Sequence, residues 1–319
     1  MLPTLALGNA QCAEAAREIV VGLSGGRDSV ALLHALHHSD YAKKIRAVHV
    51  HHGLSAHADE WAAFCKTLCG TLGIALEIIR VTVETGARIS VESAARDARY
   101  DALARVCKTD SLVALAHHAD DQIETFFLQL LRGAGTRGLA AMPAFAPTSA
   151  AQPALWRPLL GASRKEISAY VSAHDLVHIE DNSNSNLRFK RNALRLDVLP
   201  EIEKHFPAYR TALLRSISHQ QTALELINEL TQPAAQTGPI SIDVFRECSE
   251  AQGIERFRRW LHHNHLPLPP ATRTREAVRQ LRQITTDQYF RVELGEGWEL
   301  RVKQQRLVAR KAASKSEKV

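Results

Sequence analysis

Residues 19–29 constrain this chain most, because they read as an apolar strand, a glycine turn and the first turn of a helix. The strand is expected at 19–24 and the helix at 28–38, with Gly25 and Gly26 between them. Glycine allows positive φ and lets the backbone approach an anion closely. Because the first amides of a helix then point at that anion, this turn predicts a phosphate site.

The phosphate site is expected to use six consecutive residues, which are Ser24, Gly25, Gly26, Arg27, Asp28 and Ser29. Asp28 would repel a phosphate unless a cation lay between them, so we infer a Mg²⁺ ion bridging Asp28 and a triphosphate. The turn lacks the Gly-Lys-Ser/Thr ending of a Walker loop and the Gly-x-Gly-x-x-Gly spacing of a dinucleotide loop. The alternative is a tight strand-to-helix turn without a ligand.

Strand-like and helix-like segments alternate through the first part of the chain. Strands are expected at 19–24, 45–52, 75–83, 112–116 and 156–160, and helices at 28–38, 57–72, 90–108, 120–132 and 164–174. This alternation of strands and helices predicts an α/β fold with a doubly wound parallel sheet and helices on both of its faces. The ligand of such a sheet binds at the carboxyl ends of the strands. Residues 144–154 are expected to form a surface loop.

The pattern changes near residues 204–207, which predicts a catalytic domain at 1–205 and a smaller, basic α+β domain at 206–319. Helices are expected at 188–204, 209–230, 253–265 and 272–284. The alternating hydrophobicity of residues 289–310 around Gly295 and Gly297 predicts a β-hairpin.

The net charge of +6 lies entirely in the second part. Residues 1–205 hold 22 basic and 22 acidic residues, whereas residues 206–319 hold 18 and 12. This excess predicts a polyanionic partner, here an RNA, with a solvated basic surface as the alternative. Two helices would supply the phosphate contacts through Arg256, Arg258, Arg259, Arg273, Arg275, Arg279 and Arg282.

An odd, sparse set of five cysteines predicts a reducing, cytoplasmic setting. Cys65 and Cys69 are four residues apart, and no nearby Cys/His pair completes a metal site, so we expect buried thiols. No apolar run of about 18 residues predicts a membrane span. The oligomeric state stays open, with a homodimer as one option.

Residues 24–29 resemble the PP-loop of the N-type ATP pyrophosphatases, which cleave ATP between its α and β phosphates. Further segments are similar, in the same order, to those of the bacterial tRNA(Ile)-lysidine synthetases within that family. They are residues 49–54, 92–100, 116–125, 132–139, 157–164 and 181–195. His51 is a departure, because asparagine is common at that position.

The resemblance implies an ATP-dependent carbon–nitrogen ligase that uses ATP and Mg²⁺. ATP would adenylate carbon 2 of the wobble cytidine in the isoleucine tRNA with a CAU anticodon, and the ε-amine of free L-lysine would then displace AMP. The products would be lysidine, AMP and pyrophosphate. Longer members carry two C-terminal RNA-recognition domains and this chain has room for one, so a short natural form and a fragment both stay open.

Three residues would serve the adenylation step beside the phosphate loop. Arg96 and Arg99 lie three residues apart on one helix face, where both would reach phosphate. His117 stands at a strand end and would contact the α-phosphate or the base, whereas His118 is expected to be structural. The alternatives are an exposed charged helix face and a packed histidine.

Two carboxylates would serve the lysine step. Asp121 and Glu124 share a helix face, where they would hold the lysine ammonium and accept its proton. Arg191 or Arg195 would pair with the lysine carboxylate, and the sequence leaves that choice open. The alternative is a helix N-terminus that carries acidic residues because the helix dipole favours them.

Two other functions were weighed against lysidine synthesis. A cytidine thiolase of the same family depends on cysteines, often Cys-x-x-Cys pairs, and none occurs here. A non-enzymatic nucleotide- and RNA-binding module would not need Asp28, His117, Asp121 and Glu124 together. The sequence therefore favours the ligase.

Overall fold

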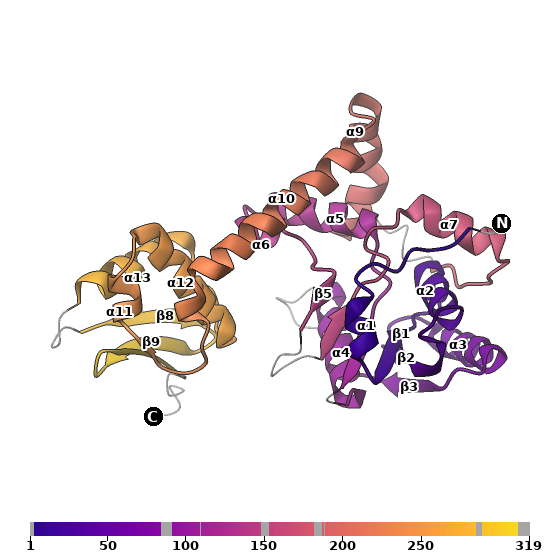
Figure 1. Cartoon of the computed structure of the whole chain (residues 1–319), viewed down its shortest axis with the longest axis horizontal. Helices are drawn as coiled ribbons and strands as arrows, with labels where there is room; N and C mark the ends of the chain where they lie inside the picture. Colours follow the sequence, from indigo (N-terminus) through magenta and orange to yellow (C-terminus); the bar gives the residue numbers. More distant parts are fainter. Residues whose placement is uncertain are drawn as a thin grey trace. The chain divides into compact units, whose positions relative to one another are not determined.

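A computed structural model describes residues 3–83, 91–108, 110–147, 153–181, 187, 189–284 and 289–311. The chain divides into two compact units, Met1–Gln220 and Gln221–Val319 (Figure 1). The division lies within the long helix α10 (Tyr209–Leu230), whose expected bounds are confirmed. The functional boundary that we expected after residue 205 stays a prediction, and residues 182–186 of the expected 181–195 motif lie outside the described residues. No helix in the described part of the chain is long and apolar enough to cross a membrane.

The first unit contains a six-stranded sheet in the order β3-β2-β1-β4-β6-β5, parallel except for β5. Its strands are β1 (Glu18–Gly22), β2 (Ile45–His51), β3 (Leu76–Arg80), β4 (Ser111–Ala114), β5 (Phe145–Ala146) and β6 (Ala154–Trp156). Its helices are α1 (Gln11–Ala15), α2 (Arg27–His37), η1 (Ala42–Lys44), α3 (Ala58–Leu72), α4 (Val91–Val106), α5 (Ala119–Leu130), α6 (Thr136–Leu139), α7 (Arg164–Ala173), α8 (Lys190–Ala193), η3 (Leu194–Val198) and α9 (Leu199–His205). The predicted α/β fold is confirmed.

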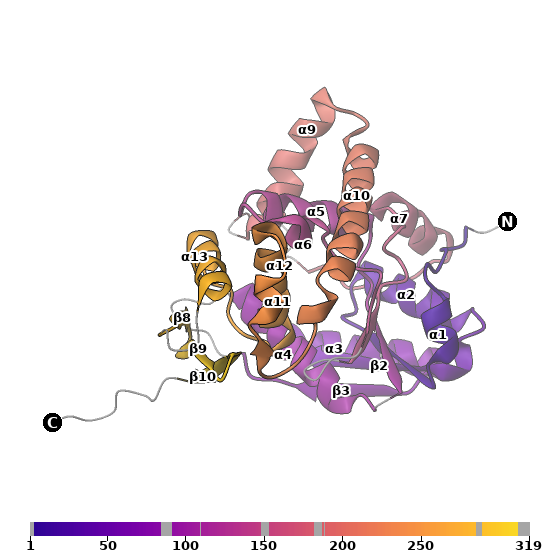
Figure 2. The ribbon, with the colours of Figure 1, turned by 60° about the vertical axis from the view of Figure 1, so that its left-hand side comes forward.

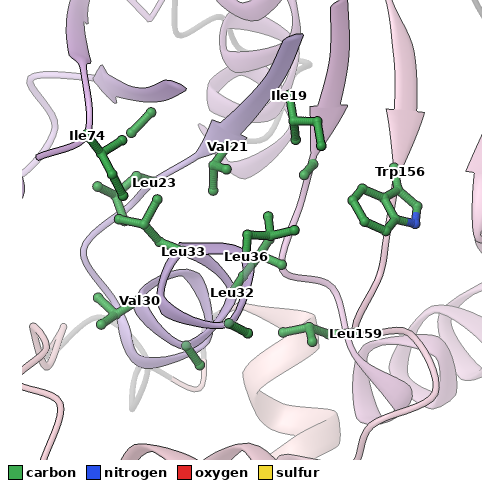
Figure 3. Close-up of a cluster of buried hydrophobic side chains, with 14 of the residues drawn as sticks. Ile19, Val21, Leu23, Val30, Leu32, Leu33, Leu36, Ile74, Trp156 and Leu159 are labelled. Carbon is green, nitrogen blue, oxygen red and sulfur yellow. The ribbon is translucent and has the colours of Figure 1, made fainter. Parts of the chain in front are cut away.

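Alternation along β1 explains why helices cover both faces of the sheet, since successive side chains point to opposite sides. Ile19 and Val21 pack in a cluster with residues of α1, α2, α3 and α7. Figure 3 shows this cluster, with α2 lying against β1 and Trp156 at its side. Val20 packs instead in a second cluster with residues of α4. A strand that is buried on both faces needs apolar residues at successive positions, which explains the continuous apolar run from which this strand was predicted.

Two expectations around β6 were wrong. Part of the expected loop at 144–154 forms β5, which pairs antiparallel with β6. The strand expected at 156–160 lies earlier, because β6 ends at Trp156 and a turn follows. Pro158 offers no amide to a ladder, which explains why the strand cannot continue there.

The basic segment expected as one helix at 188–204 is interrupted by a wide turn. Helix α8 leads into the π-helical η3, and α9 follows without a break. Leu194 and Leu199, at either end of this wide turn, are both buried in one cluster with Ile123 of α5. The segment from α8 to α9 therefore packs against α5.

The second unit holds a four-stranded antiparallel sheet in the order β7-β10-β9-β8. Its elements are η4 (Gln232–Ala234), β7 (Ile240–Ser241), α11 (Asp243–Arg246), α12 (Glu250–His263), α13 (Ala271–Gln283), β8 (Arg291–Gly295), β9 (Trp298–Lys303) and β10 (Arg306–Lys311). The helices pack on one face of the sheet, as Figures 1 and 2 show. The expected hairpin is confirmed for β8 and β9 but was incomplete, because β10 adds a second hairpin through Gln304 and Gln305.

Candidate active site

The candidate site lies at the carboxyl ends of β1 and β4, which are adjacent parallel strands in the middle of the sheet. The strand that follows β1 in the chain, β2, lies on one side of β1 in the sheet, whereas β4 and β6 lie on the other side. Ligands of open α/β sheets bind at such a switch in strand order. The glycine turn follows β1, and His117 and His118 follow β4, so the two motifs meet at this point.

The glycine turn is held in shape by its own serines and by Ile179, which forms an isolated parallel bridge with Gly26. Gly25 has a φ of +85°, and its carbonyl accepts a hydrogen bond of 2.9 Å from the amide of Ile179. A Cβ atom at Gly25 would collide with the Ile179 side chain and lie 3.2 Å from Cys65 Sγ. The Ser24 and Ser29 hydroxyls are 3.0 Å apart, and Ser29 Oγ donates to the Gly26 carbonyl at 2.9 Å. Both serines therefore stabilise the turn itself.

Helix α2 begins directly after this turn with Gly26 as its N-cap, and no side chain caps it. The first amides of a helix have no partner within the helix, and they favour an anion together with the helix dipole. The absence of a side-chain cap at Gly26 therefore suits a phosphate group.

Asp28 lies in the first turn of α2 between Arg27 and His118. Both Nε and Nη2 of Arg27 are 2.9 Å from its Oδ1, and His118 Nε2 is 3.6 Å from its Oδ2. Burial opposes ionisation, but the hydrogen bonds and charges of His118 and Arg27 outweigh it and lower the pKa of Asp28 to about 2. Asp28 is therefore a carboxylate at neutral pH, as a Mg²⁺ ligand must be.

A metal ion at Asp28 would need ligands from the nucleotide. Among the residues that the structure describes, no group of three or more His, Cys, Asp or Glu residues could hold a metal ion. Mg²⁺ characteristically takes one or two carboxylates together with phosphate oxygens. The single carboxylate beside a bare helix N-terminus fits that requirement.

The two histidines after β4 occupy different surroundings. His118 is buried, and its Nε2 lies 3.6 Å from Asp28 and 3.5 Å from Asp121 Oδ2, so it joins the starts of α2 and α5. This histidine was expected to be structural. Burial, together with the positive charge of nearby arginines, chiefly Arg157 and Arg191, holds the pKa of His117 well below its usual value. Its Nδ1 has no hydrogen-bond partner among the described residues.

Asp121 and Glu124 are brought together, as expected, by a network with both candidate arginines. Glu124 is 1% exposed and accepts hydrogen bonds of 2.6 Å from Arg191 Nε and from Arg195 Nε. Arg191 also binds Asp121 Oδ1 through Nη2 at 2.7 Å. Burial opposes the charge of Glu124, but the two arginines keep its pKa below the ordinary value. Both candidate arginines bind Glu124, so the choice of the one that would meet the lysine carboxylate stays a prediction.

Three further arginines add positive charge around the predicted residues, and of these only Arg96 was singled out as a site residue from the sequence. Arg157 is buried and donates to the Pro143 carbonyl at 2.8 Å, and Arg164 interacts electrostatically with Asp28 and Glu124. Arg96 lies on the exposed side of α4, with its guanidinium 5.3 Å from the ring centroid of Tyr100. These positive charges would favour a polyanionic substrate. Only membership of similar motif segments marked Arg157 and Arg164 beforehand.

Comparisons with known protein families agree with this geometry. A family model described as a PP-loop domain matches residues 5–202, which include the glycine turn and the α5 network. The chain belongs to the PP-loop family. Beyond the PP-loop domain, a model described as the TilS substrate binding domain matches residues 240–308.

Curated relatives share much of this sequence. The tRNA(Ile)-lysidine synthase of Burkholderia mallei is 41% identical over 293 residues, which cover 89% of this chain and 60% of that protein. The tRNA(Ile)-lysidine synthase of Vibrio cholerae is 41% identical over 265 residues, covering 81% and 60%. The chain thus spans about 60% of the length of these relatives.

A solved structure shares the fold of the PP-loop unit. The U34-tRNA thiolase NcsA from Methanococcus maripaludis, solved with its 4Fe–4S cluster, superposes with a TM-score of 0.55 at 18% identity. The match covers 67% of this chain and 75% of the thiolase. At this identity the likeness concerns the fold alone.

Proposed function

We propose that this chain is a tRNA(Ile)-lysidine synthetase that adenylates the wobble cytidine of the CAU-anticodon isoleucine tRNA and then joins L-lysine to it. The observation that carries the proposal is the His118 contact, which connects Asp28 of the PP-loop with Asp121 of the acidic network. A site that activates with ATP and then accepts an amine needs both parts within reach of one base. The name of the similar proteins from Burkholderia mallei and Vibrio cholerae, tRNA(Ile)-lysidine synthase, supports the same proposal.

The PP-loop would bind the triphosphate through Ser24, Gly25, Gly26, Arg27, Asp28 and Ser29. Asp28 would hold Mg²⁺, which would neutralise charge on the leaving pyrophosphate. Arg27 pairs with Asp28 in the structure, so it holds that carboxylate in place on the helix.

Arg96 and His117 would serve the tRNA side of the reaction. A neutral imidazole among arginines can donate to a phosphate or base without adding to the local positive charge. The arginines around it would bind the backbone on either side of the cytidine, which is already unpaired in an anticodon loop.

Asp121, Glu124 and Arg191 would form the L-lysine site, with Arg191 meeting the carboxylate, Asp121 the ammonium, and Glu124 positioning Arg191. Free lysine is mostly protonated at pH 7, because the amine pKa is about 10.4, so a carboxylate must accept its proton before attack. Glu124 is already enclosed by Arg191 and Arg195. Its part is therefore to fix both guanidinium groups, while Asp121, with an oxygen toward His118, takes the proton.

We also propose that residues 1–205 form the catalytic part and residues 206–319 the tRNA-binding part, acting in the cytoplasm. The bounds of the two matching family models support this division. A homodimer stays an option.

Labelled lysine tests the proposal directly. The protein, ATP, Mg²⁺ and the CAU-anticodon tRNA should transfer radiolabelled lysine to the tRNA, and a tRNA with uridine at the wobble position should take up none. Asp28→Asn is the matched control, because it removes one charge at nearly constant size. Folded protein and intact tRNA without any incorporation would contradict the proposal.

The thiolase alternative is disfavoured by the state of the cysteines. Cys65 and Cys69 are buried, and burial raises the pKa of Cys65 to about 12 and that of Cys69 to about 11. Thiols of this kind are poor nucleophiles and poor metal ligands. An iron-free protein that is active in the lysine assay would exclude this alternative.

A further inference from the structure

The helix arginines that we expected to contact RNA are largely used within the second unit. Arg256 donates to the Val244 carbonyl at 2.5 Å, Arg259 to the Asn228 carbonyl at 2.7 Å, and Arg282 to the Cys248 carbonyl at 2.9 Å. A guanidinium that binds buried backbone carbonyls stabilises the fold. Arg258, Arg275 and Arg279 each pair with a glutamate of the same unit, so, among the described residues, cations without any such partner lie elsewhere in this unit.

The outer face of the β8–β10 sheet carries that charge. Val292, Leu300 and Leu307 point into the core beneath the helices, so the alternate residues of the same strands point the other way. The outward cationic positions are Arg291, Arg301, Lys303, Arg306 and Arg310. Against these five cations stand two acids, Glu293 and Glu299, which gives this face a net charge of +3. We call these residues the outer sheet face.

Glu299 organises three of these arginines. Its side chain is 2% exposed, although it lies on the outward side of the strand. Arg291 Nε on β8 is 2.8 Å from its carboxylate, Arg301 Nε on β9 is 3.0 Å away, and Arg310 on β10 also pairs with it. Glu299 neutralises one of three guanidinium charges and restricts all three, and Arg291 Nη2 also donates to Glu293 Oε1 at 2.8 Å. Their remaining N–H groups form a pre-organised set of donors.

Lys303 and Arg306 extend this set along the sheet. They are paired in register across β9 and β10, and both are exposed. In the described part of the chain, no acidic side chain forms an ion pair with either of them. Two adjacent, unpaired cations cost electrostatic energy in the isolated sheet, and a polyanion would relieve it.

We propose that the outer sheet face binds the phosphate backbone of the substrate RNA, an inference that rests on the proposed function. Five cations across three strands would follow successive phosphates, and arginine forks match phosphate oxygens in pairs. An anionic membrane surface is the alternative partner for this positive charge. Membrane binding also needs apolar side chains that insert among the lipids, and Val308 is the single apolar side chain among the outward residues of β8, β9 and β10, which favours RNA.

The test removes two charges that hold nothing else in place. Lys303→Ala with Arg306→Ala, in the full chain, should weaken binding to the CAU-anticodon tRNA roughly tenfold in about 50 mM KCl. It should also reduce the slope of log K against log salt by about 2. The matched control is Lys43→Ala with Lys66→Ala, two exposed lysines of the first unit, which removes the same charge and should change affinity less than about twofold. Circular dichroism melts should match wild type for both pairs.

The outcomes separate this inference from the proposed function. In the lysine assay, the Lys303/Arg306 pair should raise the KM for tRNA and keep kcat at saturating tRNA. Tight, salt-dependent tRNA binding that this pair weakens, without any lysine incorporation by wild type, would refute the function and support the inference. Equal effects of the two variant pairs on affinity would overturn the inference. So would loss of binding to phosphatidylserine vesicles with tRNA binding unchanged.

Discussion

The network around Glu124 gives the sharpest test of the site's architecture. Glu124→Ala removes a carboxylate that is 1% exposed and that binds Arg191 and Arg195 at 2.6 Å each. Arg191 keeps Asp121, but Arg195 loses the acid that it binds. Removing one partner of a buried ion pair costs about 3–5 kcal/mol. Both arginine side chains are 21% exposed, so water reaches them and we expect the lower end, about 3 kcal/mol.

Calorimetry of thermal unfolding measures this loss. At about 2–4 °C per kcal/mol for a unit of this size, Glu124→Ala should lower the melting temperature of the first unit by about 6–12 °C at pH 7. Glu201→Ala is the control, because this acid on α9 is 59% exposed and pairs with Lys204. A surface pair of this kind contributes at most about 1 kcal/mol.

The loss of stability in Glu124→Ala should depend on pH in a definite direction. The arginines lower the pKa of Glu124 in the folded state, so its contribution is present above the ordinary carboxyl pKa and is lost as pH falls through the folded value. The gap between wild type and Glu124→Ala should therefore narrow below about pH 4. A variant that melts within about 2 °C of wild type at pH 7 would refute the reasoning.

Three further predictions concern the PP-loop and the opposite end of α2. Asp28→Asn should abolish pyrophosphate release from ATP with tRNA present. Glu124→Gln should keep pyrophosphate release and block lysine transfer. Equal loss of both steps in Glu124→Gln would contradict the assignment of Asp28 to adenylation and Glu124 to lysine transfer. Gly25→Ala should destabilise the turn and abolish ATP binding in calorimetric titration, because its Cβ would strike Ile179. Gly26→Ala should leave the melting temperature unchanged, since φ there is −71° and the nearest atom is 3.5 Å away. Burial, with neighbouring histidines, lowers the pKa of His34 to about 4, so wild type should lose about 1–3 kcal/mol between pH 6.5 and 4 that His34→Gln does not lose; parallel pH profiles in urea melts would contradict this.

Local patterns predicted those parts of the fold that local chemistry determines. The apolar run ending at Gly22, followed by two glycines, marks a strand and a turn by itself. The turn of Gln304 and Gln305 gave no such signal, because both adopt positive φ without glycine and are held by the pairing of β9 and β10. Tertiary pairing, invisible in the sequence, thus decided the strand count of the second unit.

The site shows the same limit. The PP-loop residues are contiguous and could be named, but Glu124 and Arg195 are 71 positions apart and meet only through packing of η3 on α5. The two histidines after β4 show how a difference of one position changes the site. We expected that strand to end at residue 116, whereas it ends at Ala114. Adjacent side chains of an extended chain point to opposite sides, so only one of two neighbouring histidines can face Asp28; we named His117 for the site, but His118 is the one beside Asp28.

The π-helical turn η3 makes the length of its segment a structural requirement. In a regular α-helix, residues five apart point about 140° away from each other, so Leu194 and Leu199 could not both enter the cluster with Ile123. The extra residue of the wide turn brings them to the same side. Deleting one residue there would restore an ideal helix and yet expel a leucine from the interior, so this stretch should tolerate substitution far better than any change of length.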